Sequence, residues 1–533
     1  MSMQSIDEMS DDLSPFEIKD RLIELARSKH ESMMLNAGRG NPDFIATLPR
    51  YAFLKLYEFS LSEAERSFSH LHGGFGGRPD HSGVVNRFDQ FVRANPEEQG
   101  VHFLQAAASY ANSHLGIQAE VFLSELVEAT LGCSYPSPPR MLPCAEAIVR
   151  EFIIQEINKG NRSQSDFELF ATEGGTAAMT YLFRSLFSNG LLNKGDTIAL
   201  ATPIFSPYLE IPELPEYQFN VVEIESSPDN DWQLTEEALH KLENPAIKLL
   251  CVVNPANPTS VCMNHLTLSA LADLVEHKRP DLMILTDDVY GTFTEAFRSL
   301  FTVCPRNTVC VYSFSKYYGA TGWRLGTICL NGDNVFDQKL KALPEEEKEV
   351  INRRYSSLTK EPEALGFIDR LVADSRDVAL NHTAGLSTPQ QVQMTLFALS
   401  SLLDKADTYK QSARQLIHDR FEMLYRSMGI KAPELAGNAE YYTVLDLYEI
   451  AFEVHGSPFE DWVRKLDDKP RLLYRLAEET GVVLLPGKGF EIEHPSARVS
   501  LANLTMYQYK LIGQSVKRFL DEFYQQYLDE DSA

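Results

Sequence analysis

The middle of the chain alternates short, continuously apolar runs with longer amphipathic segments. The runs have the length of strands and contain no regular polar positions, as expected for strands buried on both faces. They cover residues 197–201, 249–253, 282–286 and 308–312, and residues 266–277 between two of them have helical spacing. This pattern predicts an α/β fold with a largely parallel sheet covered by helices.

The pattern changes after about residue 385. A long helical stretch over residues 389–428 leads into three strand-like runs, at 441–447, 481–485 and 497–501. Strands interspersed with helices indicate a second, smaller α+β domain. Residues 331–377 are charged and helix-prone, and we interpret them as an insertion on the surface.

Composition, charge and cysteine spacing exclude several classes of protein for this chain. Hydrophobic residues make up 44% of the 533 and charged residues 23%, which excludes a disordered chain, and the formal net charge of −26 argues against nucleic-acid or anionic-membrane partners. Seven cysteines without a C-x-x-C pair make disulfides and metal sites unlikely by spacing. No secretory signal and no apolar run long enough to span a membrane is visible, so we expect a cytoplasmic protein.

Polar residues follow each predicted strand directly. The strand ends are Thr202-Pro203-Ile204-Phe205, Asn254-Pro255-Ala256-Asn257-Pro258, Asp287-Asp288-Val289-Tyr290 and Ser313-Phe314-Ser315-Lys316. Ligands of open parallel sheets bind at the carboxyl ends of the strands. Four such strand ends in succession therefore predict the position of the site.

Lys316 and its neighbours suggest amine chemistry beside an anion. Burial at a strand end favours a neutral amine, which forms a Schiff base with an aldehyde, although most lysines in such positions are solvated. Arg324 follows at a spacing that suits an anion clamp. The turn Gly174-Gly175-Thr176 opens a helical run, whose free N–H groups suit a phosphate together with the hydroxyls of Ser313 and Ser315.

Asp287 completes a possible ring-binding set. A fixed carboxylate keeps a pyridine nitrogen protonated, Tyr290 and Asn257 suit a ring hydroxyl, and Phe205 suits the ring face. The alternative is that Asn257 and Asp287 only cap helices.

In this order the motifs resemble the class I aminotransferases of pyridoxal-phosphate fold type I. The resemblance covers roughly residues 135–330 and 385–505, including Val483-Leu484-Leu485-Pro486-Gly487 and Ala497-Arg498-Val499-Ser500-Leu501-Ala502. Aspartate 4-decarboxylases are more similar still, in length and in Asn36-Ala37-Gly38-Arg39-Gly40-Asn41-Pro42, Tyr135-Pro136-Ser137-Pro138-Pro139-Arg140 and residues 203–212, 285–293 and 312–326. One departure is Ser260, where aminotransferases usually have glycine; it should alter the turn and leave the contact of Asn257 intact.

The resemblance implies a large domain with a mostly parallel seven-stranded sheet flanked by helices, plus a smaller α+β domain. The expected division is an N-terminal segment, 1–50, joining the small domain; a large cofactor-binding domain, 51–405, with insertions near 57–118 and 331–377; and a C-terminal small domain, 406–533.

It also implies roles for single residues. Lys316 would carry pyridoxal 5'-phosphate and move protons, with Asp287 and Tyr290 as further catalytic residues, and Asn257 and Phe205 would contact the ring. Gly174, Gly175, Thr176, Ser313, Ser315 and Arg324 would bind the phosphate, which Tyr135 would reach from a neighbouring subunit. Arg498, with Asn257, would hold the substrate α-carboxylate, and Arg39, or less strongly Lys19, would steer the distal carboxylate.

The activity implied is conversion of L-aspartate to L-alanine and CO2, with aspartate aminotransferase side activity toward 2-oxo acids. The alternatives are a plain aspartate or aromatic aminotransferase, or a regulator on the same fold, which would need a DNA-binding segment that the short, acidic N terminus does not provide. The resemblance further implies a homo-oligomer, at least a dimer and up to a dodecamer. The insertions near 57–118 and 331–377 carry apolar stripes, such as Phe103, Ala106, Ala107 and Tyr110, and would mediate contacts between dimers; the alternative is that they pack on their own subunit.

Overall fold

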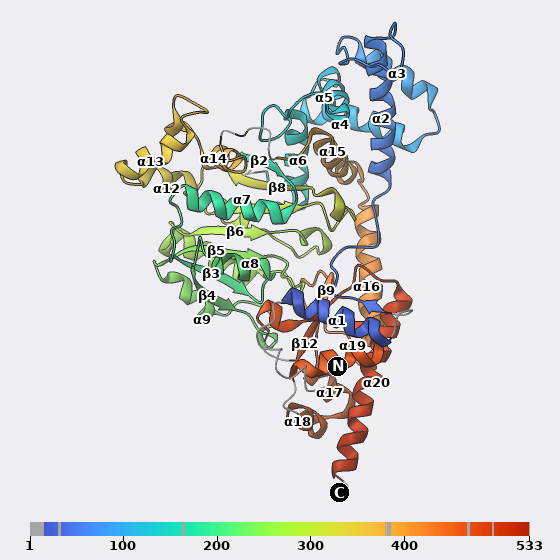
Figure 1. The fold of residues 1–533 in the computed structure, drawn as a ribbon, viewed down its shortest axis with the longest axis vertical. Helices are drawn as coiled ribbons and strands as arrows, with labels where there is room; N and C mark the ends of the chain where they lie inside the picture. The colour runs from blue at the N-terminus through green and yellow to red at the C-terminus, as the bar shows by residue number, and fades with distance from the viewer. Residues whose placement is uncertain are drawn as a thin grey trace.

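A seven-stranded sheet forms the centre of the larger part of the molecule (Figure 1). Its strand order is β2 (Phe167–Thr172), β8 (Gly326–Asn331), β7 (Thr308–Ser313), β6 (Met283–Asp287), β5 (Ile247–Val253), β3 (Thr197–Thr202) and β4 (Asn220–Glu225). Only β8 is antiparallel to its neighbours in this sheet. The predicted mostly parallel sheet is confirmed. The structure is a computed structural model that describes residues 15–29, 34–162, 166–378, 380, 385–465, 469–492 and 495–531.

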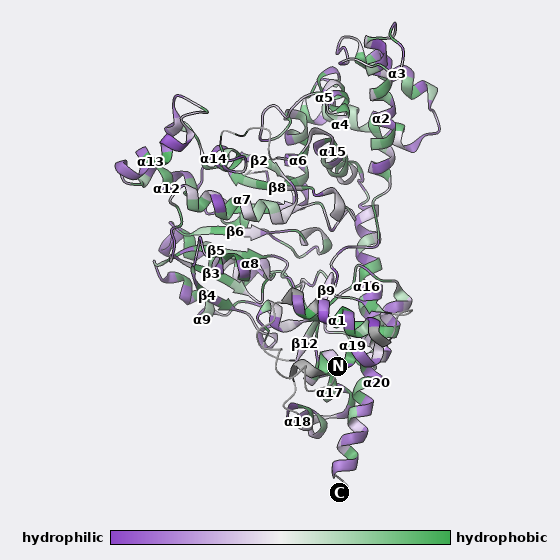
Figure 2. Ribbon diagram, in the orientation of Figure 1, coloured by the Kyte–Doolittle hydropathy of each residue, from purple (hydrophilic) through white to green (hydrophobic). Residues whose placement is uncertain are grey.

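Helices cover both faces of this sheet. Alternate residues of each strand point to opposite faces, so Val309 and Val311 of β7 pack in one cluster and Cys310 and Tyr312 in another. The first face carries α7 (Gly175–Ser188), α12 (Val335–Ala342) and α14 (Phe367–Asp374), and the second α6 (Pro143–Glu156), α10 (His265–Asp273) and α11 (Leu300–Val303). Figure 2 shows the resulting hydrophobic centre. The short helices α8 (Pro207–Glu210) and α9 (Glu236–His240) follow β3 and β4.

Residues 331–377 lie only partly on the surface, whereas we expected the whole segment there; that it is an insertion stays a prediction. Phe336 of α12 and Phe367 of α14 are fully buried in the cluster that covers the sheet, and their rings stack. Asp374 at the end of α14 is also buried and accepts hydrogen bonds from Ser185 Oγ (2.7 Å) and Tyr355 Oη (2.9 Å). α13 (Glu345–Tyr355) and residues 356–366 lie outside this layer and are mostly exposed, and the hydrogen bond of Tyr355 to Asp374 anchors α13. The many charges of the segment occupy the outward sides of amphipathic helices, which the charge pattern alone did not distinguish from an exposed insertion.

A helical assembly forms one end of the molecule (Figure 1). It consists of α2 (Leu48–Ser67), α3 (Val84–Ala94), α4 (Gln99–Leu115) and α5 (Ala119–Leu131), packed on α15 (Thr388–Leu403). Phe103, Ala107 and Tyr110 of the predicted stripe are buried in this assembly and Ala106 is exposed. This stripe therefore packs on its own subunit and offers no contact between dimers; the expected contact through the insertions stays a prediction.

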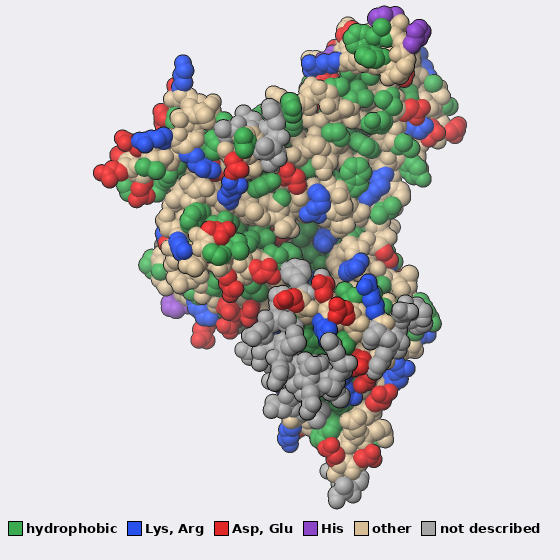
Figure 3. Space-filling view, viewed as in Figure 1, with side chains coloured by type: hydrophobic (Ala, Val, Ile, Leu, Met, Phe, Trp, Pro, Cys, Tyr) green, Lys and Arg blue, Asp and Glu red, His purple; other side chains and the backbone are tan. Residues whose placement is uncertain are grey.

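The outward side of α2 is apolar. Leu48, Tyr51, Leu54, Tyr57 and Leu61 recur at helical spacing and are all exposed, Leu54 by 60%. We call these five residues the α2 face. Figure 3 shows hydrophobic side chains gathered over this end of the molecule.

The smaller part of the molecule contains residues from both ends of the chain. α16 (Thr408–Met428) leads into it, and β11 (Leu485–Pro486), β12 (Ser496–Ser500) and β9 (Tyr442–Asp446) form an antiparallel sheet. α17 (Leu447–His455), α18 (Ser457–Lys465), α19 (Lys469–Thr480) and α20 (Met506–Asp531) surround it, and α1 (Pro15–Lys29) packs on α19. The predicted helix over 389–428 is two helices, and the predicted run 481–485 is divided between β11 and β10 (Val482–Val483), which pairs in parallel with β1 (Leu35–Asn36). The exact domain limits stay a prediction.

The segment after β1 connects the two parts. Asp43 accepts two hydrogen bonds from Arg420 of α16, at 2.9 and 2.8 Å, and Arg50 at the start of α2 donates to Tyr318 O and Gly319 O. Residues 38–41 are therefore held between β1, which pairs with β10, and the ion pair of Asp43 with Arg420. Among the described helices, none is both long and apolar enough to cross a membrane.

Candidate active site

A cavity of about 320 Å³ lies at the carboxyl ends of β5, β6 and β7. It brings together most of the residues predicted from the strand ends and motifs. These are Gly175, Thr176, Phe205, Asn257, Asp287, Tyr290, Ser313, Ser315, Lys316, Arg324 and Arg498. The remaining lining residues are Gly40, Asn41, Met179, Val253, Val289, Thr321 and Tyr442.

Four predicted residues do not line this cavity. Gly174 lies behind its rim, against Arg324. Tyr135 is 68% exposed, and Arg39 is exposed next to the lining residue Gly40. The side chain of Lys19, on α1, is outside the part of the chain that the structure describes.

Lys316 extends from the end of β7 into the cavity. Its Nζ donates a hydrogen bond to the carbonyl of Gly40, 3.0 Å away. A side chain at position 40 would crowd both Lys316 Nζ and Tyr442 Oη, so glycine is needed for this approach. The amine is thus held inside the cavity by the N-terminal segment.

The two aspartates after β6 have different surroundings. Asp288 is fully buried and accepts hydrogen bonds from Thr286 Oγ1 (2.6 Å) and Ser299 Oγ, so its role is structural. Asp287 faces the cavity, and its Oδ1 accepts a hydrogen bond from the backbone N–H of Val289. Burial, opposed by that N–H and reinforced by Asp288, raises the pKa of Asp287 to about 7. This carboxyl group is therefore poised to pair with a buried cation.

The glycine turn forms an anion site. α7 begins at Gly175, Gly174 has φ of 92°, and no side chain caps the helix. A Cβ at Gly174 would lie 2.5 Å from Arg324 Nη2, so only glycine permits the guanidinium to reach this turn. Ser313 Oγ, beside it, donates to Ser315 Oγ at 3.0 Å. Free helix N–H groups, hydroxyls and a guanidinium together suit a phosphate.

Arg498 reaches the opposite side of the cavity from β12. Its Nη1 donates to Asn257 Oδ1 (2.9 Å) and its Nη2 to Gly38 O (2.8 Å). Its Nε is buried and has no hydrogen-bond partner among the described residues. The guanidinium is therefore oriented by two fixed acceptors and has donor capacity left for a carboxylate.

Tyr442 lies beneath this guanidinium. The Arg498 Cζ atom is 4.1 Å from the centre of the Tyr442 ring, and Tyr442 Oη is 2.9 Å from Tyr290 Oη. Burial, followed by the charges of the neighbouring Tyr442 and Tyr441, raises the pKa of Tyr290 well above its ordinary value. Burial acts upward on Tyr442 as well, but Lys316, Arg498 and the hydrogen bond to Tyr290 lower its pKa overall. Of this pair, Tyr442 is the more acidic phenol.

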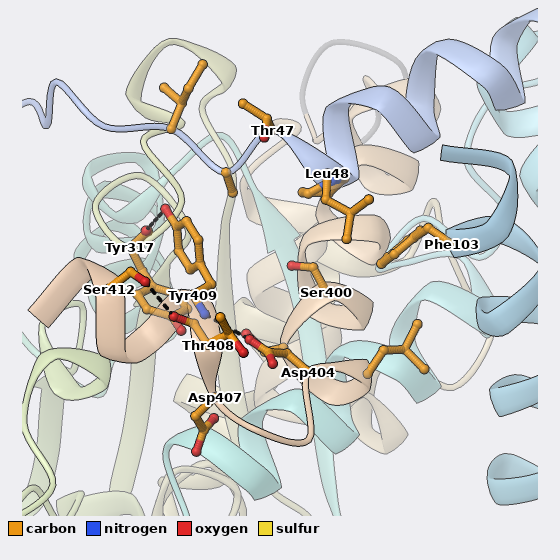
Figure 4. A pocket seen from close by; sticks show the side chains of 15 residues that line it. Thr47, Leu48, Phe103, Tyr317, Ser400, Asp404, Asp407, Thr408, Tyr409 and Ser412 are labelled. Atoms are coloured by element: carbon orange, nitrogen blue, oxygen red, sulfur yellow. Dashed lines mark hydrogen bonds between the residues drawn. The ribbon is translucent and has the colours of Figure 1, made fainter. Parts of the chain in front are cut away.

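A second cavity, of about 490 Å³, lies between the start of α2, Phe103 and the turn from α15 to α16 (Figure 4). Its two carboxylates are already engaged: Asp404 accepts the N–H of Tyr409 (2.9 Å), and Asp407 pairs with Lys410 (2.6 Å). Its lining contains no lysine, arginine or glycine turn. It does not have the groups for the chemistry of the first cavity.

Comparison with known families agrees with this geometry. The sequence pattern of the aminotransferase class I and II family matches residues 139–513. The chain belongs to this family. The resemblance to class I aminotransferases seen in the sequence is confirmed.

Within the aminotransferase class I and II family, this chain is 51% identical to the bifunctional aspartate aminotransferase and L-aspartate beta-decarboxylase of a Pseudomonas species, over 97% of each chain. It is 29% identical to the aspartate/prephenate aminotransferase of Thermus thermophilus, over 36% of this chain and 48% of that one. The solved structure of Thermus thermophilus aspartate aminotransferase with maleate has a TM-score of 0.59, at 19% identity over 97% and 99% of the two chains. This last likeness shows the fold alone.

Three residues that line the cavity of this aminotransferase-family protein were not predicted from the sequence: Tyr442, Thr321 and Met179. Tyr442 stands in a run recognised as a strand, but which of the adjacent Tyr441 and Tyr442 faces the cavity depends on the register of β9. Gly40 and Asn41 were noted as part of a motif without a position in space. Ser260 has φ of 62°, as expected where glycine is usual, and Asn257 still lines the cavity.

Proposed function

We propose that this chain is a pyridoxal-phosphate-dependent aspartate β-decarboxylase that also transaminates aspartate. The observation that carries the proposal is the joint placement of Lys316, Asp287, the glycine turn at α7 and Arg498 around one cavity. The 51% identity with a bifunctional aspartate aminotransferase and L-aspartate beta-decarboxylase over nearly the whole chain supports the choice of reaction and of L-aspartate as substrate.

The residues of the cavity fit pyridoxal phosphate. Asp287 forms no salt bridge with any described residue, although the charge of Lys316 acts on it, so its carboxyl group can pair with a protonated ring nitrogen. The uncapped start of α7, with Arg324 and Ser313, suits the phosphate. Phe205 lines the same cavity and supports a stacked ring. Lys316 is then the amine for attachment, and Asn257 and Tyr290 the partners of the ring hydroxyl.

When bound, pyridoxal phosphate supplies an aldehyde that condenses with amines and a protonated ring that withdraws electrons from the substrate carbons. Arg498 binds the α-carboxylate of aspartate with charge-assisted hydrogen bonds and, through Asn257, fixes its distance from the ring. Lys316 Nζ takes the proton from Cα and later returns one. Asp287 keeps the ring nitrogen protonated throughout.

Decarboxylation then breaks the bond between Cβ and the distal carboxylate. Carbon dioxide leaves, Cβ takes up a proton, and L-aspartate plus one proton becomes L-alanine plus CO2. Transamination uses the same Cα proton transfer by Lys316 but needs a 2-oxo acid to complete the cycle. Because both reactions share these residues, one site supports both.

The first experiment is product analysis from aspartate alone. We expect continuous release of CO2 and alanine in equal amounts without a 2-oxo acid. A plain aspartate or aromatic aminotransferase would stop after one turnover and release no CO2, which would overturn the proposed reaction.

The attachment of the cofactor is tested separately. Borohydride reduction of the holoenzyme followed by peptide mass spectrometry should place the cofactor on Lys316, and Lys316→Ala should leave no reduced adduct. An adduct on another lysine would overturn this assignment while leaving the family unchanged.

The distal carboxylate is assigned to Arg39, with Lys19 as a weaker candidate. Arg39 is exposed and adjoins Gly40, which lines the cavity, and this position supports the assignment. Arg39→Ala should change the ratio of decarboxylation to transamination. An unchanged ratio would remove Arg39 from the site.

We also propose a homo-oligomer, at least a dimer and up to a dodecamer. The α2 face is an apolar surface that costs free energy when left in water, and Tyr135, expected to reach a neighbouring site, lies on the surface with 68% exposure. A mass of one chain in light scattering, independent of concentration, would overturn this assembly.

A further inference from the structure

The cavity contains one more acid than the shared reaction steps use. Lys316 serves Cα and Asp287 serves the ring, whereas Tyr442 has no part in transamination. Its hydroxyl lies beside Lys316 Nζ, because a Cβ on Gly40 would contact both atoms. It is also 2.9 Å from Tyr290 Oη, and its ring lies under the Arg498 guanidinium. A phenol thus stands between the amine and the group assigned to the substrate carboxylate.

We propose that Tyr442 is the catalytic acid that protonates Cβ after the distal carboxylate has left. This inference rests on the proposed decarboxylation. The bond between Cβ and the carboxylate carbon breaks, CO2 leaves, and its electron pair stays with Cβ. Cβ then forms a bond to the proton of Tyr442 Oη, and the phenolate takes a proton from solvent. The net uptake is the one proton that the overall reaction requires.

The surroundings of Tyr442 favour this transfer. The titratable and charged groups facing it are Lys316 after β7, Tyr290 after β6, Arg498 on β12 and the adjacent Tyr441. The two cations stabilise a phenolate, and the hydroxyl of Tyr290 donates to it. A general acid works best when its pKa lies close to the working pH, and the lowered pKa of Tyr442 moves it in that direction.

Ser260 is the positioning residue for Tyr442. The backbone N–H of Tyr442 donates to Ser260 Oγ at 2.7 Å, and the N–H of Ala439 donates to Ser260 O at 2.8 Å. Ser260 is fully buried and adopts φ of 62°, a conformation that favours glycine. The left-handed backbone conformation is unfavourable for serine, but its hydroxyl forms a hydrogen bond that links the turn after Asn257 to β9. The departure from the usual glycine is therefore explained by the anchoring of Tyr442.

The test compares Tyr442→Phe with Tyr441→Phe. Tyr441 is an equally buried neighbour that donates to Gly40 O (2.9 Å) but does not line the cavity. We expect Tyr442→Phe to lower the ratio of decarboxylation to transamination by about 100-fold, the lower range for general acid catalysis, and Tyr441→Phe to change it less than about threefold. Ser260→Gly should lower the ratio to an intermediate value, since it keeps the turn and removes the anchor.

Two further readouts distinguish catalysis from a structural role. Decarboxylation by the unmodified enzyme should fall as the pH rises through the pKa of Tyr442, and this limb should disappear in Tyr442→Phe. In the cofactor-free protein, the phenolate difference absorbance should show a tyrosine that ionises below its ordinary pKa, lost in Tyr442→Phe and retained in Tyr441→Phe.

The outcomes separate the two proposals. If the unmodified enzyme releases no CO2 from aspartate, the proposed function fails. If it does, and Tyr442→Phe keeps the ratio and the pH limb, the inference fails alone. An equal loss of both activities with an unchanged pH limb would mean that Tyr442 only supports Tyr290, which also overturns it.

Discussion

Replacing Arg498 by lysine keeps the positive charge but removes the planar guanidinium group with its several hydrogen-bond donors. Arg498 Nη1 and Nη2 are already committed to Asn257 Oδ1 and Gly38 O, and its buried Nε has no partner among the described residues. The single nitrogen of lysine cannot bond to both of these acceptors and to a substrate carboxylate as a fork. At least one charge-assisted hydrogen bond is lost, worth about 1.5–3 kcal/mol. We therefore expect kcat/KM for aspartate to fall about 10- to 150-fold in Arg498→Lys.

The assay measures CO2 and alanine release from aspartate, and separately transamination with a 2-oxo acid. Both should fall together, because both reactions need the α-carboxylate. The matched control is Arg420→Lys: Arg420 is also buried and holds the carboxylate of Asp43 with two hydrogen bonds, but it lies outside the cavity. It should lower the Tm and change kcat/KM less than about threefold. If Arg498→Lys retains kcat/KM within threefold, or Arg420→Lys loses as much, the carboxylate assignment is refuted.

Three further predictions concern pH, stability and assembly. The pKa of Asp287 is raised in the fold to about 7, so its stabilising proton is present at low pH and is lost as the pH rises through 7. The stability of the cofactor-free protein relative to Asp287→Asn should fall from about pH 4 to pH 7 and stay level above that, by at most about 4 kcal/mol in all; a constant difference would contradict the buried carboxyl with a raised pKa. Asp374→Ala leaves buried donors without their acceptor and should lower the free energy of unfolding in urea by about 3–5 kcal/mol. The control Asp333→Ala, which removes an exposed ion pair, should lower it by less than about 1 kcal/mol. Leu54→Glu on the α2 face should lower the mass in light scattering, whereas Leu266→Glu, 77% exposed on α10, should not; equal masses would exclude the α2 face as an interface.

The central sheet was predictable because its strands are buried on both faces. The run 308–312 corresponds to β7 within one residue, and the other three predicted runs fall within one or two residues of β3, β5 and β6. β2, β8 and β4 were not among the predicted runs; β4 forms an edge of the sheet and is exposed or half-buried, with Ile224 as its buried residue. The break between α15 and α16 was missed because apolar spacing continues on both sides of it.

The candidate site was predictable where function coincides with a strand end. Asp287, Ser313 and Lys316 follow strands, so their convergence follows from the topology of a parallel sheet. Tyr442 belongs to an antiparallel sheet of the other part of the molecule, and its approach to Lys316 depends on packing between segments distant in sequence. Local patterns carry no information on that approach. Arg39 was predicted from a motif to lie in the site, but in the structure it is exposed outside the cavity lining. Its position also depends on packing between distant segments, which the motif does not reveal.

The pairing of β1 with β10 has a consequence for how the protein is made. Gly38 and Gly40 follow β1 near the start of the chain, while Tyr442 and Arg498 stand near its end. During synthesis, the strands and helices that cover the seven-stranded sheet are available long before these later residues emerge, and domains generally fold as units as they appear. β1 therefore cannot form its pairing with β10 until β10 has left the ribosome. Contacts between such distant residues form slowly, because a long loop has to close. The nascent protein thus acquires a folded sheet first and a complete catalytic cavity last, so an interrupted chain has no means of acting on its substrate.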